Sequence, residues 1–266
     1  MPAPEEHVTR MRVCVIGDSH TAALKAGWTS IAGEFARADL TFFAARRELL
    51  VNLAVQDGAL VPTDPRLRRA FKERAGGATR IEPRFDSYIL CGMGSGVKAV
   101  LPLLSRHRPA TIAPDGRQGL SNACYAACMA RVLGLTPMMW LLGLLRQISG
   151  APAALVATPA SAPRLAFAML AQRGEDAALV SLYTSAFESL AGPLGARFLA
   201  QPRETLHKSV LSTDPVYFRG SEHLAGDEDD QSHANAEYGA IVLRRALTAL
   251  TSESRADPKP TPLTRC

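Results

Sequence analysis

Two polar tetrapeptides near opposite ends of this 266-residue chain contain the residue types needed for nucleophilic catalysis. Residues 17–20 read Gly-Asp-Ser-His after a short apolar run, and residues 230–233 read Asp-Gln-Ser-His before the last amphipathic stretch. A serine hydroxyl is a poor nucleophile until a positioned imidazole takes its proton, and that imidazole needs a carboxylate to fix its tautomer. Ser19, His233 and Asp230 are therefore candidates for nucleophile, general base and orienting acid.

Each tetrapeptide also has a purely structural explanation. Asp18 or Ser19 could simply cap the helix that follows, and Asp230 ends an acidic run, residues 227–230, of a kind common in solvated loops. In the functional interpretation, a hydroxyl at this turn lies beside the free N–H groups of a helix N-terminus, which can stabilise a developing oxyanion. We expect His20 to line the pocket rather than act as the base, because the same turn sets its backbone direction.

A third polar group, Gly-Met-Gly-Ser-Gly at residues 92–96, follows a predicted strand. It lacks the spacing of a dinucleotide-binding loop and the Lys-Ser/Thr of a Walker loop, so a turn at the end of a strand is favoured over nucleotide binding. Ligands of parallel sheets bind beyond the carboxyl ends of the strands. Gly92, Gly94 and Ser95 are therefore predicted to lie at the oxyanion or substrate side of the site, together with Asp18 and His20.

Strand and helix signals alternate along the chain, which predicts a parallel sheet covered on both faces. Short apolar runs predict strands at residues 12–16, 40–44, 86–91, 153–157 and 196–200. Apolar residues at helical spacing predict helices at residues 21–36, 121–132, 137–148, 164–173, 176–191 and 234–250.

The length fits one large α/β domain, predicted over residues 1–250. Proline and glycine punctuate residues 46–83, where we expect an irregular insertion with a short helix near residues 66–74. Residues 251–266 are polar and contain three prolines, which predicts a disordered tail.

Residues 15–19 (Val-Ile-Gly-Asp-Ser) and the Asp230-x-x-His233 pair resemble the first and last signature blocks of the SGNH/GDSL hydrolases. The order of elements agrees over nearly the whole chain, and Ala-Thr-Pro at residues 157–159 resembles the usual exit from the fourth strand of the family. The resemblance implies a three-layer, flavodoxin-like α/β fold with a five-stranded parallel sheet. It also implies a catalytic triad of Ser19, Asp230 and His233.

The chain departs from the family after the third strand. The family has Gly-x-Asn-Asp there, and its Asn donates to the oxyanion, whereas this chain has Gly94 at the position of the Asn. The nearest candidate for the glycine of the second signature block is Gly58. Losing one oxyanion donor typically lowers turnover by about two to three orders of magnitude. Replacement donors could be backbone N–H groups or amide side chains, namely those of Ser19, Gly94, Ser95, Asn52 and Asn122.

The resemblance implies a serine ester hydrolase that works through an acyl-enzyme and requires neither a metal nor an organic cofactor. Acetyl and other small acyl groups carried on a carbohydrate are the preferred substrates, because many relatives act on them. Two alternatives remain open: an O-acyltransferase that passes the acyl group to a sugar hydroxyl, and a binding protein that keeps the fold without catalysis. How far the pocket excludes water would decide whether water or a sugar hydroxyl accepts the acyl group.

The basic residues are spread along the chain, with 30 Lys and Arg against 25 Asp and Glu and a net charge of +5. The tightest clusters are residues 66–74 and 106–108. A solvated helix face explains them best, and a groove for an anionic substrate is the alternative, since binding nucleic acid requires a clustered stripe of charge. Nucleic-acid binding is therefore not predicted.

The cysteines and the apolar segments of the chain indicate the cellular compartment in which the protein is expected. The five cysteines include no CxxC pair and are expected to be reduced thiols. Residues 1–10 are polar and unlike an export signal, and the most apolar segment, residues 135–145, contains Pro137 and is too short to span a bilayer. A cytoplasmic protein without a membrane partner is expected, and its oligomeric state is left open.

Overall fold

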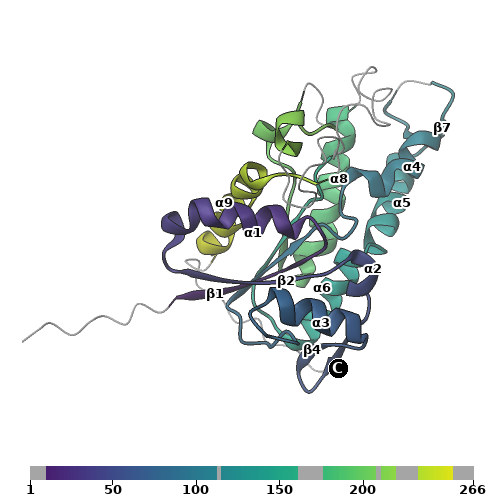
Figure 1. Ribbon diagram of the computed structural model, residues 1–266. Coiled ribbons are helices and arrows are strands. Elements are labelled where there is room, and N and C mark those ends of the chain that lie inside the picture. The colour runs from purple at the N-terminus through teal and green to yellow at the C-terminus, as the bar shows by residue number, and fades with distance from the viewer. Residues whose placement is uncertain (1–9, 113–114, 161–175, 208–210, 220–232, 254–266) are drawn as a thin grey trace, which may run out of the picture.

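The computed structural model describes residues 10–112, 115–160, 176–207, 211–219 and 233–253 (Figure 1). Its centre is a sheet of five parallel strands in the order β2-β1-β5-β8-β9. In chain order this is 2-1-3-4-5, the order of flavodoxin-like folds. The predicted five-stranded parallel sheet is confirmed. The strands are β1 (Met11–Gly17), β2 (Ala38–Ala44), β5 (Ser87–Cys91), β8 (Ala153–Val156) and β9 (Ala196–Leu199).

Helices cover both faces of this sheet and make three layers. Alternate residues of a strand point to opposite faces, so Val13 and Val15 of β1 pack with α1 and α9, while Cys14 and Ile16 belong to the core beneath the other helices. Figure 1 shows α1 and α9 on one side of the sheet and α3 and α6 on the other. The first layer comprises α1 (Thr21–Ile31) and α9 (Ala236–Glu253), and the second α3 (Pro65–Arg74), α5 (Asn122–Gly134), α6 (Pro137–Ile148) and α8 (Asp176–Ala191).

Residues 46–83 are more regular than predicted. The expected helix is α3, but a short helix α2 (Arg47–Leu50) and a hairpin of β3 (Leu53–Gln56) and β4 (Ala59–Pro62) precede it. The hairpin turns at Asp57 and Gly58, both with positive φ, as a type I′ turn requires. An Asp-Gly pair between two short apolar runs was the signal for this hairpin, and the sequence interpretation overlooked it.

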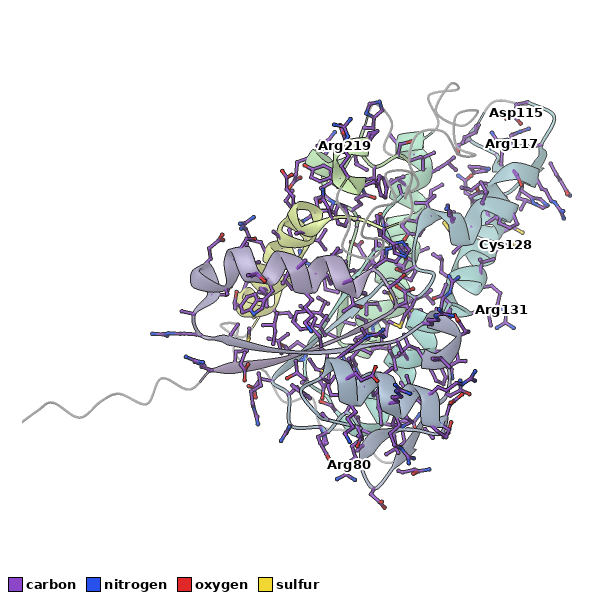
Figure 2. All side chains as sticks on the ribbon, in the orientation of Figure 1. Arg80, Asp115, Arg117, Cys128, Arg131 and Arg219 are labelled. Carbon is purple, nitrogen blue, oxygen red and sulfur yellow. The ribbon has the colours of Figure 1, made fainter. Side chains whose placement is uncertain are left out.

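Smaller elements lie around these layers. A helix α4 (Leu101–Arg106) leads into the two-stranded sheet of β6 (His107–Pro109) and β7 (Gln118–Leu120), near which Figure 2 labels Asp115 and Arg117. Single turns of 3₁₀ helix are η1 (Ala32–Phe35), η2 (Val97–Val100), η3 (Gly192–Leu194), η4 (Arg203–Thr205) and η5 (Pro215–Phe218).

Two sequence expectations fall partly outside the described residues. The helix predicted over 164–173 lies outside them, as do residues 254–266 of the predicted tail. Helix α9 runs on to Glu253, three residues beyond its predicted end. Within the described ranges no single helix is long and apolar enough to cross a bilayer, and α5 with α6 reaches that length only across a 67° bend.

Candidate active site

Ser19 lies in the tight turn between β1 and α1. Gly17 permits this turn, because a Cβ there would come within 2.3 Å of the Cys91 carbonyl oxygen on the neighbouring strand. The buried Asp18 carboxylate then accepts the backbone N–H of Met93 at 2.7 Å and that of His20 at 3.2 Å. Asp18 therefore fastens the β1 turn to the β5 turn and is a positioning residue. Ser19 itself is partly exposed.

His233 comes from the far end of the chain and meets Ser19. The atoms Ser19 Oγ and His233 Nε2 are 3.0 Å apart, within the range for a nucleophile and its base. His233 lies just before α9, and α9 packs closely against α1. The two residues are 214 positions apart in the sequence, and the packing of these two helices brings them together.

His20 lies beside this pair. Its ring centroid is 5.8 Å from that of His233, with the rings tilted by 37°. His20 is not among the described residues that line the cavity at Ser19, so its expected role in lining the pocket stays a prediction. Asp230 falls outside the described residues, so its role as the third member of a triad stays a prediction.

The turn after β5 has an unusual backbone. Gly92, Met93 and Gly94 all have positive φ, at 76°, 53° and 74°. A Cβ on residue 92 would lie 2.1 Å from Asp18 Oδ1, so Gly92 is required for the approach of the carboxylate. Met93 is a non-glycine residue in a sparsely populated region, held there by its N–H bond to Asp18 and its fully buried side chain. Strain of this kind clusters at functional sites.

Ser95 has a structural role rather than the predicted substrate contact. It is fully buried, and its Oγ donates to the Gly92 carbonyl at 2.7 Å and accepts the Thr158 N–H at 3.1 Å. Its carbonyl also accepts the Tyr183 hydroxyl. With its polar groups used in this way, Ser95 links the turn after β5 to the end of β8 and to α8.

The amide side chains considered as replacement oxyanion donors lie elsewhere. Asn122 is exposed at the first turn of α5 and lines neither cavity described below, and Figure 2 shows Cys128 and Arg131 of the same helix on the side away from α1. Asn52 donates to the carbonyls of Glu48 and Leu49 at the end of α2. Gly58 forms the tip of the β3–β4 hairpin, as the turn geometry there requires.

The Arg47 guanidinium lies beside Gly94. A Cβ built on Gly94 would lie 3.4 Å from Arg47 Nη1 at the start of α2, and both residues line a cavity of about 230 Å³. The sequence interpretation missed Arg47, because no local pattern relates a residue after β2 to one after β5. Among the described residues, the backbone N–H groups of Ser19 and Gly94 have no hydrogen-bond acceptor, so both are free to bind an oxygen of a ligand.

A second cavity, of about 320 Å³, opens directly at Ser19. Its apolar wall includes Phe42 and Ala45, and its polar groups include the cations of Lys25, Arg46 and Arg74. This volume is at the low end for small-molecule sites.

Two further groups of side chains near this site were considered as metal ligands or as nucleophiles. Over the part of the chain that the structure describes, no group of three His, Cys, Asp or Glu side chains is placed to hold a metal ion. Cys91 is the thiol nearest the turn, and burial, with a smaller contribution from the Asp18 charge, raises its pKa well above the usual value. Cys91 therefore stays a protonated core thiol.

Distant likenesses to solved structures accompany this geometry. No family model and no curated protein matches the sequence. Among solved structures, an extracellular lipase from Streptomyces rimosus has 9% identity and a TM-score of 0.47, with 90% of this chain and 99% of that chain covered. Phospholipase A1 from Streptomyces albidoflavus has 12% identity and a TM-score of 0.47, with 91% and 99% covered. Sequence identities and TM-scores this low say nothing of what this chain acts on.

Proposed function

We propose that this chain is a serine-dependent ester hydrolase of the SGNH/GDSL type. The observation that carries the proposal is the 3.0 Å separation of Ser19 Oγ and His233 Nε2 across the α1–α9 contact. Two residues so distant in sequence have no local reason to meet, and a hydroxyl paired with an imidazole at a cavity mouth is the arrangement that acyl transfer requires.

The reaction divides into two acyl transfers. In the first, His233 Nε2 takes the Ser19 hydroxyl proton as Oγ bonds to the ester carbonyl carbon, and the imidazolium then returns that proton to the departing alcohol. In the second, His233 deprotonates water, which attacks the acyl-enzyme and releases the acid with Ser19 restored. Asp230 is proposed to orient the imidazole and offset its charge.

The oxyanion formed in both steps needs donors in place of the missing Asn. The free N–H groups of Ser19 and Gly94 are proposed to supply two of them, helped by the N-terminal end of α1, where the helix dipole favours negative charge. The Arg47 guanidinium beside Gly94 is proposed as the third.

Small acyl esters are the proposed substrates, since a cavity of about 320 Å³ suits a short acyl group better than a long chain. Acetyl esters of carbohydrates are the class that the family resemblance implies. The anionic character of the substrate is argued separately below.

The test is covalent labelling with a fluorophosphonate probe alongside turnover of p-nitrophenyl acetate. Wild-type protein is expected to be labelled and to turn over the ester, and Ser19→Ala to do neither. Ser30→Ala is the matched control, because the Ser30 hydroxyl only donates to the Gly27 carbonyl within α1. Labelling that persists in Ser19→Ala, or an unlabelled wild type, overturns the proposal. A sugar that accelerates turnover and accumulates as its acyl ester would identify a transferase.

A further inference from the structure

Three cationic side chains from three separate elements converge on the cavity at Ser19. Lys25 extends from the second turn of α1, Arg46 follows β2, and Arg74 is the last residue of α3. Their separation in the sequence hides this convergence. Arg74 belongs to the basic cluster at residues 66–74, for which a solvated face was the favoured explanation.

Among the described residues that line this cavity, cations outnumber acids. The one carboxylate among those described lining residues is Asp18, whose two oxygens accept the N–H groups of Met93 and His20. Within the described ranges, Lys25, Arg46 and Arg74 form no ion pair, and the one contact of Arg74 is its donation to the Ala44 carbonyl at 2.8 Å. By contrast, Arg66 and Arg69 on the same helix are paired with Asp64 and Glu73.

Unpaired cations around a concave, partly apolar site focus a positive potential into it and attract anions. Arginine presents a planar fork of donors that matches carboxylate and phosphate oxygens, while lysine contributes a point charge. The Arg74 side chain is already fixed at one end by the Ala44 carbonyl, which lowers the entropic cost of ordering it around a ligand.

We propose that the substrate is an acyl ester that carries a carboxylate or phosphate group, which Lys25, Arg46 and Arg74 bind beside Ser19. This inference rests on the proposed function for the ester, but its anion site can be measured without turnover. Phe42 and Ala45, which line the same cavity, can contact an apolar part of such a substrate.

Binding is measured by calorimetry on Ser19→Ala protein, which cannot consume the ligand. The probes are 4-acetoxybenzoate, its neutral methyl ester, and 4-acetoxyphenyl phosphate. We expect the anionic probes to bind at least about tenfold more tightly than the methyl ester. Lys25→Met and Arg74→Met should each weaken the binding of the anionic probes by about tenfold and leave the binding of the methyl ester unchanged. Tighter binding of the benzoate or of the phosphate identifies which anion the site prefers.

Lys72→Met is the matched control, since Lys72 is an exposed cation on α3 that does not line the cavity. It is expected to leave all three affinities unchanged. Lys25 is exposed, and its side chain forms no hydrogen bond or ion pair with another described residue, so the Lys25→Met variant remains informative even if Arg74→Met unfolds. Equal affinity for the benzoate and its methyl ester overturns the anion site. So does a loss of affinity for the anionic probes in Lys72→Met as large as the loss in Lys25→Met.

The two proposals fail in different ways. Loss of turnover in Ser19→Ala with no preference for anionic probes overturns the anion site and supports the hydrolase. Selective binding of anions that depends on Lys25, in a protein whose Ser19 is unreactive, overturns the hydrolase and supports the anion site.

Discussion

Gly27 of α1 and Gly239 of α9 meet backbone against backbone. A Cβ on Gly27 would lie 2.5 Å from the Gly239 carbonyl carbon, and a Cβ on Gly239 would lie 1.7 Å from the Ala23 carbonyl oxygen. This crossing holds together the two helices whose N-terminal ends carry Ser19 and His233. The separation of nucleophile and base is therefore set by a glycine contact within the helix layer.

Gly239→Ala is expected to force α9 away from α1 and to lower both stability and activity. Overpacking of this kind costs about 1–3 kcal/mol, measured as the free energy of unfolding in urea. Gly143→Ala on α6 is the control, because its Cβ would meet nothing within 4 Å and should stabilise the helix by about 0.5–1 kcal/mol. An unchanged free energy of unfolding in Gly239→Ala would show that the two helices accommodate the added methyl group, which would contradict this prediction.

His233→Ala should abolish turnover while leaving the protein folded. We expect kcat to fall by about four to six orders of magnitude, since the base acts as a unit with its nucleophile. His20→Ala is the comparison, because the ring nitrogen 3.0 Å from Ser19 Oγ is His233 Nε2. The kcat/KM of His20→Ala should fall by less than about tenfold, or 1.4 kcal/mol. A larger loss of activity in His20→Ala than in His233→Ala would identify His20 as the base.

Asp230→Asn tests the predicted third member of the triad. An amide in place of the carboxylate stabilises the wrong imidazole tautomer, so kcat should fall by about 10³- to 10⁴-fold with KM little changed. Asp229→Asn removes a neighbouring charge of the same acidic run without removing the proposed partner of the imidazole, so it should change kcat by less than about twofold. Equal effects of the two variants would contradict the assignment.

Arg47→Ala tests the donor beside Gly94. Removal of one oxyanion donor is expected to lower kcat by about 10²-fold while KM changes little, because the interaction develops in the transition state. Arg47→Lys keeps a charge and should recover part of the loss. A wild-type kcat in Arg47→Ala would leave the backbone N–H groups as the only donors.

Asp86→Asn should make the free energy of unfolding depend less on pH. The Arg12 side chain donates to Asp86, whose carboxylate also accepts the Arg12 backbone N–H, and these contacts lower the Asp86 pKa. A lowered pKa in the folded state means that the stabilisation is present at neutral pH and is lost as the pH falls through that pKa.

Because both side chains are partly exposed, the expected loss for Asp86→Asn is about 0.5 kcal/mol at pH 7. The unfolding temperatures of the variant and the wild type should converge only as the pH falls below the lowered Asp86 pKa, where the carboxyl is protonated in both states of the wild type. A difference in Tm that stays constant from pH 7 to pH 3 would assign the effect to the backbone contact alone.

The sequence by itself determined the fold class and singled out Ser19 and His233 as a candidate pair, which the structure places 3.0 Å apart. Apolar runs such as residues 12–16 and 86–91 can be buried on both faces only in the centre of a covered parallel sheet, so alternation with helices was enough to predict the architecture. The Gly-Asp-Ser and Asp-x-x-His blocks singled out Ser19 and His233, because a hydroxyl and an imidazole at these two places in the chain resemble the first and last blocks of one hydrolase family.

Only the tertiary structure decided what surrounds that pair. Ser95 was placed correctly at the end of a strand, but its burial and bonding partners depend on β8 and α8, which no local pattern relates to it. The same holds for Arg47 beside Gly94 and for the convergence of Lys25 and Arg74. Side chains from separate elements become neighbours through packing, and the free energy of packing is a sum over contacts that a single stretch of sequence does not contain.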